Sequence, residues 1–335
     1  MKLDEIPYLS HVPRDGRDLL LLPWYDANDE SWHLYLEAQP GDFIKMQNGA
    51  VSSGLYYAEH PASSSDLEIL LATLVAQHLS FPPVARALYS LVDDLHLLSA
   101  SLEKLELVRH VANGRAKSSF LVESELEYMF TLVRAMYDLL QKMAKEVASL
   151  LRTHDGKAVV AQLPGSFARA ALDDDRPRTV EELQAKYSLP DPLASFYSAH
   201  SPRFIKFRAI RVDIEHHGRR IPMVFETEHG FGISTEGPPH WSSLEVWGQH
   251  TLLPNDIGSV RALAVYLAQS FLETLNDFEA ALRRVIAPEL LPPAVAHENR
   301  VFMTNPLIHN LSHLATAAAS PWIDPPDASA SEGMG

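Results

Sequence analysis

The chain has 335 residues, of which 46% are hydrophobic and 21% are charged, and its formal charge is −15. This composition is typical of a folded, soluble protein, and the negative charge argues against a surface that binds nucleic acid or anionic membranes as a whole. The sequence contains no cysteine, which excludes disulfides, thiolate metal ligands and cysteine nucleophiles.

The first ten residues, MKLDEIPYLS, lack the basic and apolar pattern of a secretory signal. No stretch approaches the roughly 18–20 apolar residues that a membrane span requires. We therefore expect a cytoplasmic protein that does not enter a membrane. Residues 318–335 are rich in Pro, Ser, Gly and acids, and we expect them to form a disordered tail.

Residues 1–62 carry the least regular pattern in the chain. Trp32, Leu34 and Leu36 alternate with polar neighbours, which is the spacing of a half-buried strand. Because glycines interrupt the sequence beyond them, we expect an irregular N-terminal region of extended segments and loops.

Apolar stripes at helical spacing begin after this region and predict a bundle of helices. The first stripe is expected to end at Pro82, because proline breaks a helix. The second and third are joined by a short polar loop, which predicts an antiparallel helical hairpin. The four stripes cover about residues 66–81, 88–112, 119–152 and 258–287.

Shorter signals lie between the third and the last stripe. Thr179 and Glu182 have the spacing of a capping box, Asp191 precedes a proline that is expected to open another helix, and residues 219–235 predict a small β-hairpin. The predicted fold class is therefore mainly α, a multi-helix bundle with one small β-hairpin and irregular N-terminal extended segments. The predicted division is residues 1–62, a helical domain at 63–317 with C-terminal helices over 258–317, and the tail.

Residues 202–220, PRFIKFRAIRVDIEHHGRR, are the segment most suggestive of function. They contain six Lys or Arg and two acids, a local charge of +4 in a chain of −15. A basic island on an acidic surface directs an anionic ligand to one place. The alternative is that these basic residues pair with the surplus acids of the same chain.

Arg211 and His216 provide a chemistry for this basic island. Histidine exchanges a proton most easily near neutral pH, and arginine stabilises negative charge on phosphate oxygens. On a regular helix five residues turn the chain by about 140°, so the two side chains do not share one face. A common site requires the helix to distort near Gly218, or a second copy of the protein to complete the cleft.

The segment Arg211-Val-Asp-Ile-Glu-His216 resembles the motif of the HEPN superfamily, small helical domains that often dimerise and cut RNA without a metal. The resemblance covers about residues 66–218. It implies a metal-independent endoribonuclease without a cofactor, acting as a homodimer on RNA in a toxin or defence role. It assigns transition-state stabilisation to Arg211 and proton transfer to His216.

Other residues complete this hypothesis, and two assignments stay open. An acidic partner for Arg211 is expected from Asp138 or Glu127, which lie on nearly the same face of the third stripe. Arg208 fits the motif in place of Arg211, and His217 fits the looser spacing. The residues expected to contact the substrate are Lys206, Arg208 and His217.

The second hypothesis is a non-catalytic helical protein in which the same stretch serves dimerisation or binds a protein partner or inhibitor. Val212 favours it, because the HEPN motif has a polar residue at this position. His309 and His313 have a spacing that can chelate a metal, but no carboxylate accompanies them and we interpret them as packed side chains. We therefore predict no metal site.

Overall fold

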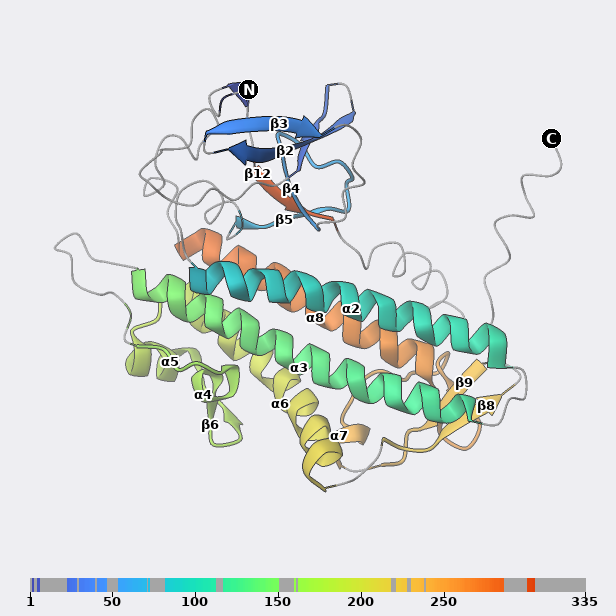
Figure 1. The fold of residues 1–335 in the computed structure, drawn as a ribbon. Coiled ribbons are helices and arrows are strands. Elements are labelled where there is room, and N and C mark those ends of the chain that lie inside the picture. Colours follow the sequence, from blue (N-terminus) through green and yellow to red (C-terminus); the bar gives the residue numbers. More distant parts are fainter. Residues whose placement is uncertain are drawn as a thin grey trace.

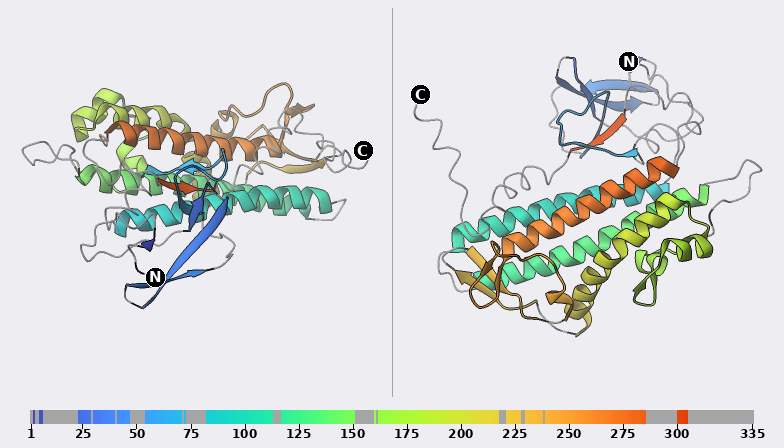
Figure 2. Two further views of the ribbon diagram at one scale, coloured as in Figure 1. Left: turned by 90° about the horizontal axis from the view of Figure 1, so that it is seen from above. Right: turned by 180° about the vertical axis from the view of Figure 1, so that it is seen from behind.

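The structure is a computed structural model in which long helices lie side by side beneath a β-sheet (Figures 1 and 2). The four long helices are α2 (Pro82–Ala112), α3 (Ser118–Leu150), α6 (Asp191–His217) and α8 (Val260–Val285), and the short ones are α4 (Phe167–Ala171), α5 (Val180–Tyr187) and α7 (Pro239–Ser242). The residues that the structure describes are 2, 5–6, 23–28, 30–39, 41–46, 54–70, 72, 82–112, 117–150, 160, 162–217, 221–227, 230–237, 239–285 and 300–304.

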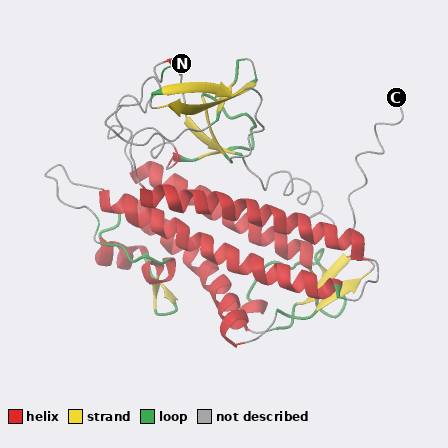
Figure 3. Ribbon diagram, in the orientation of Figure 1, coloured by secondary structure: helices red, strands yellow, loops and turns green. Residues whose placement is uncertain are grey.

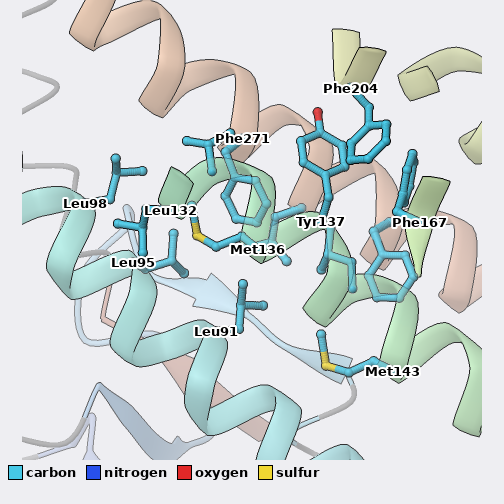
Figure 4. Close-up of a cluster of buried hydrophobic side chains, with 14 of the residues drawn as sticks. Leu91, Leu95, Leu98, Leu132, Met136, Tyr137, Met143, Phe167, Phe204 and Phe271 are labelled. Carbon is cyan, nitrogen blue, oxygen red and sulfur yellow. The ribbon is translucent and has the colours of Figure 1, made fainter. Parts of the chain in front are cut away.

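The apolar stripes of the long helices meet in one continuous core (Figure 4). Helix α2 contributes Leu91, Leu95 and Leu98, each exposed by 2% or less. Aromatic rings from four other helices fill the centre: Tyr137 of α3 lies 5.3 Å from Phe204 of α6 and 6.0 Å from Phe271 of α8, measured between ring centroids, and it also contacts Phe167 of α4. Close packing of this kind makes the bundle sensitive to the loss of any one ring.

The largest sheet joins the two ends of the chain. Its strand order is β3-β2-β1-β4-β12-β5, so the C-terminal strand pairs between two N-terminal ones. Only β1 and β4 run parallel among these pairs; the others are antiparallel. The strands are β1 (Trp24–Asp26), β2 (Ser31–Gln39), β3 (Asp42–Met46), β4 (Leu55–Ala58), β5 (Leu67–Glu68) and β12 (Arg300–Met303).

Side chains of this sheet alternate between two environments, as the period of two requires. On the face toward the helices, Tyr57 and Val301 are fully buried in the main core. On the opposite face, Tyr56 and Phe302 stack at 5.8 Å between ring centroids and form a second, smaller cluster with Trp32. One face of the sheet therefore packs on the bundle, and the opposite face carries a separate group of apolar side chains.

Two further sheets lie beside the helices (Figure 3). The predicted β-hairpin is confirmed, and two more strands extend it to four in the order β10-β11-β9-β8. The third sheet is a two-stranded hairpin that contacts α6. The strands are β6 (Leu172–Asp173), β7 (Arg176–Pro177), β8 (Val224–Thr227), β9 (Gly230–Ser234), β10 (Leu252–Leu253) and β11 (Ile257–Ser259).

The predicted fold class was wrong, because the protein is a mixed α/β structure with three sheets and not a mainly α bundle. Most of the strands span only two to five residues, too short to establish a clear alternating pattern. The pairing of β4 with β12 also joins segments more than 240 residues apart, and local sequence patterns carry no sign of such a partner. Strands β1 to β4 all lie within residues 1–62, and β12 lies within the range expected to be helical.

Helix prediction was more successful. The second, third and last stripes are confirmed as α2, α3 and α8, and the capping box of Thr179 and Glu182 is present at the start of α5. The first stripe was wrong at its start, since Leu67–Glu68 is a strand, whereas Leu70 and Ala72 are helical. Pro82 begins α2, which is compatible with proline because the first turn of a helix needs no N–H donor.

None of the helices in the described ranges has the length and apolarity needed to cross a bilayer. The expected C-terminal tail and the pair His309 and His313 lie outside the described residues.

Substituting Phe204 with alanine is expected to lower the free energy of unfolding by about 3–5 kcal/mol, because the ring is fully buried between Tyr137 and Phe167. The matched control is Met223→Ala, whose side chain is 65% exposed and whose loss should change stability by no more than about 0.5 kcal/mol. Urea denaturation followed by circular dichroism measures both, and equal effects would contradict the described core.

Candidate anion-binding face of helix α6

Helix α6 packs one apolar flank against the bundle, and its basic side chains lie around the rest of the helix. Phe204, Phe207 and Ile210 are at most 5% exposed, and Phe207 packs edge-on against Phe130 of α3. The helix runs without interruption from Asp191 to His217 and has a proline inside it at position 202. Its position against α3 and α8 decides which side chains of the basic stretch face outward.

Arg203 contacts helix α8 of the bundle. Its guanidinium lies 3.0 Å from the Glu273 carboxylate of α8 and also donates a hydrogen bond of 3.0 Å to the backbone carbonyl of Ser270. The first basic residue of the stretch therefore ties α6 to α8.

Arg208 has an exposed carboxylate partner. Its Nη1 lies 2.7 Å from Oδ1 of Asp175, in the turn between β6 and β7. The Asp175 side chain is 84% exposed and that of Arg208 is 37% exposed. An exposed pair of this kind contributes only about 0–1 kcal/mol, so an anionic ligand can compete with Asp175 for the guanidinium.

Lys206 and Arg211 are both half-buried, and because they are five residues apart they lie about 140° from each other around the helix. No salt bridge joins Lys206 to any residue in the described ranges. Arg211 and His216 both belong to the unbroken helix, so the angle of about 140° between them persists. The side chains of His216 and His217 lie outside the described residues.

The two predicted acidic partners have separate roles. Asp138 forms an ion pair of 2.6 Å with Arg134, and its other oxygen accepts a hydrogen bond of 3.0 Å from the backbone N–H of Phe167. It therefore fixes the start of α4. Glu127 is half-buried in α3, and its backbone carbonyl accepts a hydrogen bond from the Thr131 hydroxyl.

A buried polar network that sequence reasoning missed lies beside this helix. The Thr274 hydroxyl of α8 is fully buried and lies 3.0 Å from the Tyr137 hydroxyl and 3.1 Å from Nδ1 of His200. The other ring nitrogen of His200 lies 3.0 Å from Asp277. Because Thr274 has no access to solvent, this arrangement holds three helices together and does not present a nucleophile.

One signal in the sequence pointed to this network. Thr274 lies three residues after Phe271 and four before Phe278, on the apolar face of α8. A polar side chain on such a face must find a hydrogen-bond partner, because an unpaired buried hydroxyl is costly. The identity of the partners, which come from α3 and α6, is not encoded in that spacing.

A second candidate surface is the edge of the six-stranded sheet at β3, the last strand of the order formed by the described residues. Leu36 of β2 and Ile44 of edge strand β3 are directly opposite each other and are 42% and 53% exposed. Met46, on the same side of β3, is 39% exposed. At the other end of β3, Lys2 forms a β-bridge with Asp42, and their side chains pair at 2.6 Å.

Comparisons with protein-family models, curated proteins and solved structures found no match to this chain. Among the described residues, no group of three His, Asp or Glu side chains is placed to hold a metal ion. A function for the chain must therefore be inferred from its own surfaces.

The His200 network predicts a specific pH dependence of stability. Burial lowers the pKa of His200 below its usual value, an effect that Asp277 partly opposes. A group with a lowered folded pKa contributes stability above its unfolded pKa near 6.5, and this contribution is lost as the pH falls. His200→Gln should therefore flatten the fall in unfolding free energy between pH 6.5 and 5.

Urea denaturation at four pH values between 5 and 8 measures this slope. The matched control is His240→Gln, because the His240 side chain is exposed on α7. The buried network has no role in acid sensitivity if both variants keep the wild-type slope.

Proposed function

We propose that this protein is a self-associating interaction protein in which edge strand β3 pairs with β3 of a second copy. The observation that carries this proposal is the exposed apolar row of Leu36, Ile44 and Met46 at edge strand β3, which among the described residues pairs only with β2 and, at Asp42, with Lys2. Soluble proteins usually protect such an edge with charge, proline or a covering segment. An exposed apolar group beside unpaired strand backbone is typical of a site for strand addition.

The geometry of β3 suits a twofold contact. Antiparallel pairing around Ile44 would place the two Ile44 side chains opposite each other and extend the sheet across both copies. In this register Met46 of one copy lies opposite Asp42 of the other, so the β-bridge between Lys2 and Asp42 would have to open to admit the partner strand. Two copies of charge −15 repel each other at long range, and salt screens that repulsion. Self-association should therefore strengthen as the salt concentration rises.

Ile44→Lys is expected to abolish self-association, because it places two like charges opposite each other at the centre of the contact. Sedimentation velocity at micromolar concentration should show a dimer for the wild type and a monomer for this variant. The control is Met223→Lys, which adds the same charge at a 65% exposed position outside the sheet. A wild type that stays monomeric at 150 mM salt, or a dimer that survives Ile44→Lys, would contradict the proposal.

A second candidate function is a metal-independent endoribonuclease of HEPN type. Two observations favour it: Arg211 is only half-buried, and the exposed Asp175 is a weak competitor for the neighbouring Arg208. Because the helix is unbroken through His217, the Arg211 and His216 that share one site would come from two copies. Arg211 would stabilise the charge on the phosphate, and His216 would transfer the proton. Lys206, Arg208 and His217 would bind flanking phosphates.

Arg211→Ala and His216→Ala are each expected to reduce RNA cleavage by at least about 100-fold, which is typical for loss of a proton-transfer or charge-stabilising group. Cleavage by the wild type should persist in EDTA. A fluorogenic RNA measures the rate, and circular dichroism checks the fold. Arg86→Ala is the control, because this arginine is exposed on α2. Activity that survives in both variants would reject this candidate.

The two candidates require different contacts between copies. The six-stranded sheet lies on one side of the bundle, and the outer end of α6 lies on the other (Figures 1 and 2). Pairing through β3 would therefore not bring two α6 helices together. Ile44→Lys should leave any Arg211-dependent RNA cleavage intact, which distinguishes failure of one candidate from failure of the other.

A further inference from the structure

A cluster of charged side chains lies where the six-stranded sheet meets α8. Glu68 of β5 pairs with Arg283 of α8 and with Arg300 of β12, each at 3.0 Å. Arg283 also donates a hydrogen bond of 3.4 Å to the backbone carbonyl of Glu68. One carboxylate thus connects the last turns of α8 to two strands of the sheet.

Glu279 lies one helical turn before Arg283 and differs from Glu68 in being buried. Its side chain is packed in the interior, the residue is only 7% exposed, and its carboxyl oxygen accepts a hydrogen bond of 3.1 Å from the backbone N–H of Leu70. Leu70 follows β5 closely in the chain. The N–H of Leu70 and the Glu279 carboxyl therefore form a second, buried connection between sheet and helix.

We propose that Glu279 controls the junction between the six-stranded sheet and α8 through its protonation state. The protonated side chain stabilises the contact between sheet and helix, and the ionised side chain weakens it. The reason is that burying an ionised carboxylate in an apolar interior costs free energy, so the folded state favours the protonated, neutral carboxyl. If strand β5 separates from α8, Glu279 meets water and ionises freely. The inference concerns the junction between sheet and helix and does not depend on either proposed function.

The groups around Glu279 shift the pKa of its carboxyl in opposite directions. Burial raises the pKa of the Glu279 carboxyl to about 7, Arg283 on the same helix and the Leu70 N–H lower it, and Glu68 of β5 raises it further. Arg300 of β12 acts on Glu68. A carboxyl whose pKa is higher in the folded state than in the open state loses its stabilising effect as the pH rises from about 4.5 to about 7. The junction is therefore firm in mild acid and weaker above neutral pH.

Hydrogen exchange followed by mass spectrometry, corrected for the intrinsic effect of pH on exchange, tests this inference on the full chain. Opening of the segments that contain Leu70 and residues 300–303 should increase about tenfold from pH 6 to pH 8, as linkage predicts for a group with these two pKa values. Peptides from the centre of α3 should show no such increase.

Glu279→Gln keeps the shape and can still accept the Leu70 N–H, so it should remove the tenfold increase. Glu245→Gln makes the same change at an exposed position and should keep it. If Glu279→Gln does not fold, Glu68→Gln provides a second test, because removing that negative charge lowers the pKa of Glu279 and should reduce the increase.

Three results would overturn the inference. They are equal protection of the sheet at pH 6 and pH 8 in the wild type, an increase that persists in Glu279→Gln or is undiminished in Glu68→Gln, and an increase that spreads equally to α3. The last result would mean that the whole molecule opens and that the junction has no separate response.

Discussion

The arrangement of the bundle depends on hydrogen bonds buried where α3, α6 and α8 cross. Thr274 meets Tyr137 and His200 there, and Tyr197 of α6 donates to Gln141 of α3, whose amide in turn donates to a backbone carbonyl. Apolar packing alone tolerates small shifts of one helix along another. A shift that leaves a buried polar group without its hydrogen-bond partner is costly in free energy. The polar contacts therefore fix the register of three helices, and with it the side of α6 that faces outward.

The sheet adds a constraint from the ends of the chain. Strand β12 follows α8 and pairs between β4 and β5, so the sheet is complete only when α8 has brought the C-terminal region back to the N-terminal strands. Contacts of such long sequence separation are costly in loop entropy and form late in folding. The junction of sheet and α8 contains two carboxyl connections, through Glu68 and Glu279, in addition to apolar packing.

The features that the sequence predicted are those formed by residues close together in the chain. Helices α2, α3 and α8 were predictable because their stripes are local and repeat over many turns, and the capping box of Thr179 is likewise local. The sheet was not, since its strands are short and their partners distant. In the candidate site, the apolar flank of α6 was predictable from spacing, whereas the pairing of Arg208 with Asp175 and of Asp138 with Arg134 and Phe167 depends on how separate elements meet.

Ion pairs with acidic residues lower the net positive charge of the basic stretch. Residues 202–220 carry a formal charge of +4, but Glu273 and Asp175 each cancel one positive charge on Arg203 and Arg208, which halves that excess. At physiological salt the field of the remaining charges is screened within about 8 Å. Among the described residues, an anion would therefore be drawn to α6 only at short range, through Lys206 or by displacing the exposed Asp175. Recognition at this face must rest on direct contact with these side chains and not on long-range attraction to an acidic protein.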